Sequence, residues 1–177
     1  MKVLILQYGR KGGFTERAVN HFIQGIGETS LQYETIDLFP LRIGHCDACI
    51  QCRSDVCSID DDMQWIVQRI RSSDALVLAC PIYFNNVPSK VKALIDRLHP
   101  FWFESLSKQA CISYILVAGR RSTNFLGVKE VIKAMSYTMN LRIMDGIEIA
   151  GTDDGVDQST YDGLYLFGTR FEDDLNR

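Results

Sequence analysis

The chain has 177 residues, about the length of one domain, and a formal net charge of -3. Its 46% hydrophobic and 23% charged residues are the proportions of an ordinary globular protein. The acidic balance argues against nucleic acid as the main partner, since phosphate binding favours a basic face. No apolar run approaches the ~20 residues that span a bilayer, and the run over residues 1–6 is too short for a signal peptide. We therefore expect no membrane partner and a cytoplasmic location, where clustered cysteines favour metal or redox chemistry over disulfides.

Apolar runs alternate with helical periodicity along the chain, which predicts βαβ units and a parallel sheet. The expected strands span residues 3–6, 33–38, 75–80, 111–117 and 143–149, and the expected helices carry apolar stripes at 18–26, 63–70, 91–98 and 128–139. Thr15 is expected to cap the first helix, and the acidic residues 60–62 to begin the second.

This pattern predicts an α/β fold, namely a flavodoxin-like, doubly wound, five-stranded parallel sheet with helices on both faces. We expect a single domain over residues 1–177, with a cysteine-rich loop at 45–58. The C-terminal arm at 151–177 is less regular, and residues 161–171 fit either a short helix or a packed segment.

The first candidate site is the glycine-rich loop at residues 7–15, between the first strand and the first helix. Such a loop presents backbone N–H groups to an anion at a helix N-terminus, and Arg10, Lys11 and Thr15 add positive charge and a hydroxyl. It is neither a Walker loop nor a G-x-G-x-x-G dinucleotide loop, so a phosphate monoester is the better match. The alternative is a tight basic turn that binds nothing.

A second candidate site follows the third strand, where a planar ligand would lie against a doubly wound sheet. The aromatic faces of Tyr83 and Phe84 and the amide of Asn85 suit such a ligand, although packing is the commoner use of aromatic residues.

The third candidate site is the run of four cysteines with the spacing C-x2-C-x2-C-x4-C, namely Cys46, Cys49, Cys52 and Cys57. Short hops of this kind hold iron–sulfur clusters in bacterial ferredoxins, which favours a cluster here. There are three alternatives. The loop could bind zinc, although zinc sites usually consist of two separated cysteine pairs. The cysteines could also form two disulfides or remain as four free thiols. The other two cysteines, Cys80 and Cys111, fall within strands and are expected to be small core residues.

Weaker features accompany these sites. His45 adjoins the cysteine loop and could bond a sulfur atom, although an exposed loop histidine is the better explanation. Residues 101–103, Phe-Trp-Phe, suit a subunit interface, the ligand pocket or core packing. No Ser-His-Asp, Cys-His or H-E-x-x-H constellation supports a hydrolase.

Taken in order, five motifs resemble those of the NAD(P)H-dependent FMN reductase-like flavoproteins, and within them the iron–sulfur flavoproteins. They are R-K-G-G-x-T at 10–15, the cysteine run at 46–57, D-D-M at 61–63, P-I-Y-F at 81–84 and K-A-L-I-D-R at 92–97. The resemblance covers roughly residues 1–120. It implies FMN at the loops after the first, third and fourth strands and a [4Fe–4S] cluster on the four cysteines. It also implies a homodimer or a tetramer, with cluster and flavin near a subunit interface.

The resemblance assigns roles to individual residues. Arg10, Gly13 and Thr15 match the phosphate loop, Gly119 matches the third loop, and the flavin-ring and ribityl segment is matched by Pro81, Ile82, Tyr83, Phe84 and Asn85. Two positions depart from the pattern, because Tyr8 stands where relatives usually have serine and Phe14 where they have asparagine. Losing such hydrogen bonds to a phosphate, at ~1–3 kcal/mol each, would weaken FMN binding tenfold or more.

We therefore expect an oxidoreductase in which FMN passes electrons to or from a [4Fe–4S] cluster. NAD(P)H or a reduced ferredoxin is the expected electron donor, and a ferredoxin or a small molecule the acceptor. No side chain is assigned as catalytic, since the cofactors carry the redox chemistry. The alternatives are an NAD(P)H-dependent FMN or quinone reductase without a cluster, and a flavodoxin-like scaffold that has lost FMN.

Overall fold

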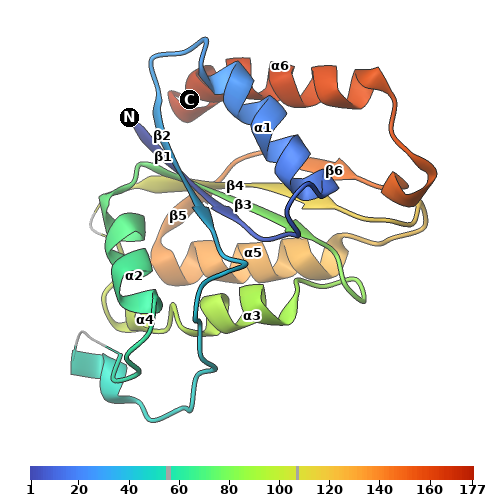
Figure 1. Ribbon diagram of the computed structural model, residues 1–177. Helices are drawn as coiled ribbons and strands as arrows, with labels where there is room; N and C mark the ends of the chain where they lie inside the picture. The colour runs from blue at the N-terminus through green and yellow to red at the C-terminus, as the bar shows by residue number, and fades with distance from the viewer. Residues whose placement is uncertain (55–56, 107) are drawn as a thin grey trace.

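A computed structural model describes residues 1–54, 57–106 and 108–177 (Figure 1). Within these ranges one parallel sheet has the strand order β2-β1-β3-β4-β5, and β6 also pairs with β4. This is the 2-1-3-4-5 order of a flavodoxin-like doubly wound sheet, so the predicted fold class is confirmed. The strands are β1 Lys2–Gln7, β2 Gln32–Asp37, β3 Ala75–Pro81, β4 Ala110–Val117, β5 Leu141–Ile143 and β6 Ile147–Ile149.

Helices cover both faces of the sheet (Figure 1). One face carries α1 (Phe14–Ile26) and α6 (Gln158–Leu175). The other carries α2 (Met63–Ser72), α3 (Ser89–Asp96), α4 (Pro100–Phe103) and α5 (Leu126–Met139). Short 3-10 turns, η1 (Gln51–Ser54) and η2 (Thr152–Asp154), lie in the cysteine loop and after β6.

The central strands are apolar on both sides, as a sheet covered on two faces requires. In β1, Val3 and Ile5 pack in the core under α1 and α6, whereas Leu4 and Leu6 pack in the core on the opposite face. Successive side chains of a strand point to opposite faces, so this continuous apolar run is packed against helices on both sides of the sheet.

The expected fifth strand, residues 143–149, is two short strands. β5 begins earlier, at Leu141, and a break over residues 144–146 separates it from β6. At the break the Ser113 hydroxyl donates to the Asp145 carbonyl at 2.7 Å. Gly146 approaches the Tyr114 ring so closely that an added Cβ would stand 2.5 Å from it. Since β5 and β6 both pair with β4, they share one position at the sheet edge.

The C-terminal arm forms the long helix α6 rather than a short helix over 161–171. The Asp157 side chain caps its first turn by accepting from the Thr160 amide. α6 lies directly against α1, where Gly25 and Gly168 allow the two backbones to touch: a Cβ at Gly168 would stand 2.2 Å from the Phe22 carbonyl.

α2 begins at Met63, slightly later than the acidic residues 60–62 suggested.

Candidate functional site

A cavity of about 810 Å³ opens at the carboxyl ends of the central strands. This volume is within the range of small-molecule and cofactor sites. Its wall includes all eleven residues that the sequence predicted to bind FMN, namely Tyr8, Arg10, Gly13, Phe14, Thr15, Pro81, Ile82, Tyr83, Phe84, Asn85 and Gly119. The parallel sheet brings them together because the loops after β1, β3 and β4 leave the same edge.

The first loop makes a tight turn at the start of α1. The Gly13 amide donates to the Arg10 carbonyl at 2.9 Å, and a Cβ on Gly13 would stand 2.8 Å from that oxygen, so glycine is required for this close turn. The amide of Gly12 donates to the Glu16 carboxylate, so the loop already engages an anionic group. Thr15 is buried on the cavity wall.

The two residues that depart from the family pattern have partners outside the loop. The Phe14 ring packs on Tyr161 of α6 with the ring centroids 5.8 Å apart, and the Arg17 guanidinium lies 5.5 Å from its centroid. The Tyr8 ring packs on Phe39 at 5.8 Å. Burial, helped by Tyr83, raises the pKa of Tyr8, so its hydroxyl stays protonated as a donor at the cavity wall.

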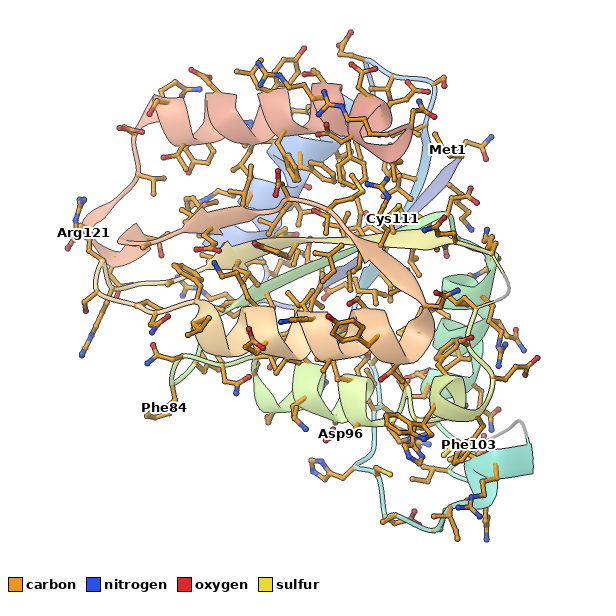
Figure 2. All side chains as sticks on the ribbon, turned by 180° about the vertical axis from the view of Figure 1, so that it is seen from behind. Met1, Phe84, Asp96, Phe103, Cys111 and Arg121 are labelled. Carbon is orange, nitrogen blue, oxygen red and sulfur yellow. The ribbon has the colours of Figure 1, made fainter. Side chains whose placement is uncertain are left out.

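The second loop makes a tight turn with two residues in the left-handed region, Phe84 at φ +52° and Asn85 at φ +57°. Reciprocal hydrogen bonds between the main chains of Tyr83 and Asn86, at 2.9 and 3.0 Å, close this turn. Such conformations are uncommon for residues other than glycine and are found at functional loops. The turn exposes the Phe84 side chain fully at the cavity rim (Figure 2). The Asn85 side-chain carbonyl accepts from the Asn124 amide at 3.3 Å, which leaves its NH₂ group to contact a ligand.

The third side of the cavity depends on a long-range contact. The turn η2 folds back onto the end of β4, where the Thr152 and Asp153 amides donate to the Ala118 and Gly119 carbonyls, each at 3.1 Å. Gly119 lies so close to η2 that an added Cβ would stand 2.4 Å from the Asp153 carboxylate. Further wall residues were not indicated by the sequence: Phe39, Val117, Arg120, Ser122, Thr123, Thr152 and Asp153. The acidic pair at 153–154, just after the fifth strand position, is the signal that could have indicated η2.

The cysteine loop lies away from this cavity, beside α4 and the far end of α3 (Figure 1). None of its described residues lines the cavity. Figure 2 shows Phe84 at the cavity rim and Phe103, whose ring lies 5.4 Å from the Arg53 guanidinium of the loop, at opposite ends of the lower helical layer.

The four thiols of the loop differ in exposure. Cys46 is exposed, Cys49 and Cys57 are partly buried, and Cys52 is buried. Burial raises the pKa of Cys52, and the three other thiols add to the effect, so each of them lies within electrostatic range of Cys52. The Cys52 sulfur lies 3.3 Å from Nδ1 of His99, a partner that the sequence did not indicate.

This donor set suits a soft, thiolate-held centre chemically. Four sulfurs share one loop, and the buried guanidinium of Arg97, beside Cys57, supplies positive charge for thiolates. The described residues nevertheless gather no group of three metal-ligating side chains. The loop therefore carries suitable sulfur ligands, but in this structure they do not form a closed metal site.

Cys80 and Cys111 are core residues, as predicted. Burial raises the pKa of Cys80 to about 12, so its thiol does not ionise near neutral pH. In the segment 101–103, Phe101 packs in the core, whereas Trp102 and Phe103 are exposed and line no part of the cavity.

The sheet order and the cavity at its carboxyl edge define a flavodoxin-like protein. Residues 1–152 match the NADPH-dependent FMN reductase family, and the chain belongs to that family.

Curated relatives include iron–sulfur flavoproteins from two archaea. The protein from Methanosarcina thermophila is 35% identical over 89 residues, which cover 50% of this chain and 47% of the relative. One from Methanocaldococcus jannaschii is 30% identical over 92 residues, covering 51% and 48%. The chain thus matches about half the length of these relatives.

Solved structures share the fold at lower identity. An NAD(P)H:quinone oxidoreductase from Methanothermobacter marburgensis is similar with a TM-score of 0.76 and 19% identity, over 97% of this chain and 96% of that one. A flavone reductase is similar with a TM-score of 0.79 and 17% identity, over 99% of this chain and 63% of that one. Among the described residues, no helix is long and apolar enough to cross a membrane.

Proposed function

We propose that the protein is an FMN-dependent oxidoreductase in which FMN exchanges electrons with an iron–sulfur centre held by Cys46, Cys49, Cys52 and Cys57. One observation carries the proposal: the eleven residues that the sequence predicted for FMN, from three separate loops, line a single cavity of about 810 Å³. Membership in the NADPH-dependent FMN reductase family supports the same cofactor.

The cavity offers each part of FMN a matching group. The turn at residues 9–13 and the N-terminus of α1 would bind the phosphate, with Arg10 supplying charge and Thr15 a hydroxyl. Tyr8 would donate its hydroxyl where relatives use serine, while Phe14 can offer only its backbone amide. The loop over Pro81–Asn85 would hold the edge of the flavin ring.

When bound, FMN supplies the acceptance of two electrons and their release singly, and the cluster supplies a one-electron site. The residues of the chain would bind the two cofactors, orient them and shield them from solvent. The donor is NAD(P)H or a reduced ferredoxin, and the acceptor is a ferredoxin or a small molecule. The exposed ring of Phe84 at the rim would contact whichever partner approaches the flavin.

The separation of the two sites favours an oligomer. No described residue of the cysteine loop lines the cavity of its own protomer. A homodimer or tetramer, with the flavin of one protomer near the cysteines of another, would shorten the electron path.

The test is cofactor analysis of protein purified without oxygen. We expect FMN to bind with fluorescence quenching, and iron and acid-labile sulfide to be present. The Cys49→Ser variant should lose the iron and the ~400 nm absorption of the cluster while it keeps FMN. A protein that quenches no FMN fluorescence would refute the proposal, and a variant that keeps its iron would refute the ligand assignment.

A second function is favoured by one observation, the lack of a preformed three-ligand metal group among the described residues. In this alternative the protein is an NAD(P)H-dependent quinone or flavin reductase without a cluster. Quinone-dependent NAD(P)H oxidation that is equally fast in wild type and in Cys49→Ser, with no iron in either, would favour it.

A further inference from the structure

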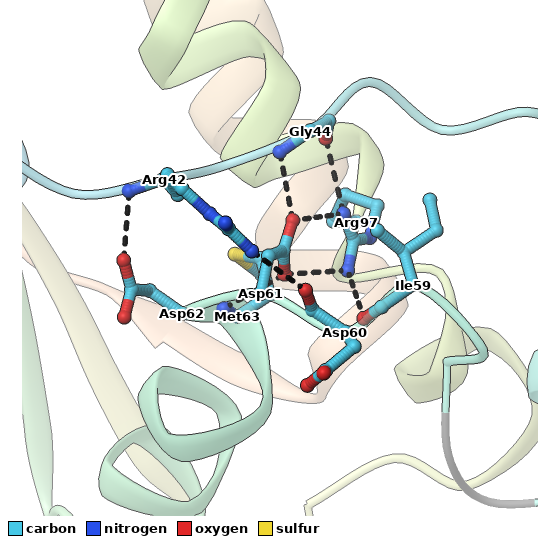
Figure 3. A network of polar contacts seen from close by, with 8 residues as sticks. All are labelled: Arg42, Gly44, Ile59, Asp60, Asp61, Asp62, Met63 and Arg97. Atoms are coloured by element: carbon cyan, nitrogen blue, oxygen red, sulfur yellow. Dashed lines mark hydrogen bonds and ion pairs between the residues drawn. The ribbon is translucent and has the colours of Figure 1, made fainter.

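A buried ion pair joins the two ends of the cysteine loop (Figure 3). Arg97, the residue after α3, donates through Nη1 and Nη2 to the two carboxylate oxygens of Asp61, at 2.8 and 2.9 Å. Their side chains are only 1% and 4% exposed. Paired N–H groups on a carboxylate fix both side chains in one orientation, which a single contact does not.

Both partners also bond the main chain at the base of the loop. Asp61 accepts from the Gly44 amide at 2.8 Å, just before the first cysteine. Arg97 donates to the Gly44 carbonyl at 3.1 Å and, more weakly at 3.5 Å, to the Ile59 carbonyl just after the last one. The pair thus connects the chain entering the loop with the chain leaving it. We call residues 42–44 and 59–62 the neck of the loop.

A second set of contacts reinforces the neck. The Asp62 amide donates to the Arg42 carbonyl at 3.1 Å, and the Asp62 carboxylate accepts from the Arg42 amide at 2.7 Å. The Arg42 guanidinium donates to the Asp60 carbonyl at 3.1 Å. These contacts are exposed to solvent, where water weakens them. The buried ion pair of Arg97 and Asp61 is protected from water.

One donor in the network is not used. Arg97 Nε is buried, and no described residue accepts a hydrogen bond from it. Buried N–H groups without an acceptor are rare because they cost free energy. Cys57 lines the same small cavity as Arg97, of about 280 Å³, and its thiol is close enough to raise the pKa of the guanidinium.

We propose that Arg97 and Asp61 are the positioning residues of the cysteine loop: they hold its two ends together so that the four thiols converge. We call the Arg97–Asp61 pair the tether of the loop. Its effect on a bound metal rests on the proposed function, but the tether itself does not. Apart from this pair and the exposed contacts, the described part of the loop meets the fold at Cys52, 3.3 Å from His99, and at Arg53, 5.4 Å from the Phe103 ring.

The experiment compares wild type with Arg97→Lys and Asp61→Asn. Lysine keeps the positive charge but cannot form the two parallel hydrogen bonds, and asparagine keeps the shape but loses the negative charge. In metal-free protein we expect trypsin to cleave after Arg53, inside the loop, about tenfold faster in both variants, because local opening costs less. In iron-loaded protein, a chelator should bleach the ~400 nm absorption about tenfold faster.

Two controls separate the tether from a general loss of stability. Asp96→Asn removes an exposed ion pair with Lys92 next to Arg97, and should change neither rate. FMN affinity should remain at the wild-type value in every variant, because the cavity shares no residue with the neck. If Arg97→Lys does not fold, the double variant Asp61→Leu with Arg97→Met removes both charges and is used instead.

The outcomes are distinguishable. Cleavage after Arg53 at the wild-type rate in both variants would overturn the proposal, and so would a parallel loss of FMN affinity. Faster cleavage with unchanged cluster lifetime would also overturn it, because the tether would then not serve the metal site. If wild type takes up no iron, the proposed cluster fails, and the cleavage rates alone decide whether the tether exists.

Discussion

The FMN cavity and the cysteine loop are built in opposite ways. Each wall of the cavity follows a buried strand, so the sheet itself fixes where the loops lie. The cysteine loop leaves the sheet after β2 and is held mainly by side chains: a buried ion pair and exposed hydrogen bonds at its neck, and the contact of Cys52 with His99. A pocket made by strand ends is formed by the sheet alone, whereas the shape of a long tethered loop depends on its tether.

The largest effect is expected when the tether loses one charge. Arg97→Leu leaves the Asp61 carboxylate buried and uncompensated, which should lower the free energy of unfolding by about 3–5 kcal/mol. Urea denaturation measures it. The exposed pair of Arg121 and Asp154 offers the matched control, since Arg121→Leu should cost less than about 1 kcal/mol. Equal losses in the two variants would contradict the distinction between the sites.

The pH dependence of stability should reveal the same carboxylate. Burial alone would raise the pKa of Asp61, but hydrogen bonds from Arg97 and from the Gly44 and Met63 amides outweigh it and hold the pKa below its usual value. Because the folded pKa is lowered, the stabilisation is complete above the unfolded value of about 3.9 and is lost as the pH falls below it.

We therefore expect wild type to exceed Asp61→Asn in stability by a constant amount above about pH 5. The difference should shrink as the pH falls below about 4, when Asp61 itself becomes neutral. Urea denaturation at several pH values gives the curve. A difference that is unchanged down to pH ~2 would show that folding does not lower the pKa of Asp61.

On the cavity side, Phe14→Asn should tighten FMN binding. It restores an amide donor at the phosphate loop, which is worth about 1–3 kcal/mol to a charged acceptor. The lost ring contact with Tyr161 lowers the stability of the fold rather than the affinity for FMN. We expect about a tenfold gain in affinity by fluorescence titration. Riboflavin, which lacks the phosphate, should show no gain; a gain for both ligands would place the phosphate elsewhere.

The smallest effect is expected for Glu16→Gln. The Glu16 carboxylate accepts from the Gly12 amide and would repel a phosphate in the same loop. Removing its charge should strengthen FMN binding by about 0.3–1 kcal/mol, the usual size of a charge effect at a helix N-terminus. The gain should diminish at high salt. Weaker binding in the variant would mean that Glu16 assists the ligand rather than competing with it.

The sequence predicted the cavity better than the tether, for a physical reason. Arg10 and Tyr83 follow apolar strands, whose carboxyl ends meet at one edge of a parallel sheet. Local patterns therefore indicated two loops of the cavity, and the family resemblance added Gly119. Asp61 and Arg97 lie 36 residues apart and meet only in the folded chain. In the sequence, Asp61 looked like part of an acidic helix start.

Other differences have the same origin. The split between β5 and β6 depends on the Gly146 contact with Tyr114 and on the Ser113 hydrogen bond, both of which are tertiary. The length of α6 depends on the close approach of Gly25 to Gly168. The contact between Cys52 and His99 likewise joins residues from distant parts of the chain.

The most direct test of the account is the absorption spectrum of anaerobically purified protein, with FMN, iron and sulfide measured on the same sample. We predict one FMN and about four iron atoms per protomer, with the flavin bands kept and the ~400 nm cluster absorption lost in Cys49→Ser. A colourless protein, or one that binds zinc in place of iron, would contradict the pairing of a flavin with an iron–sulfur centre.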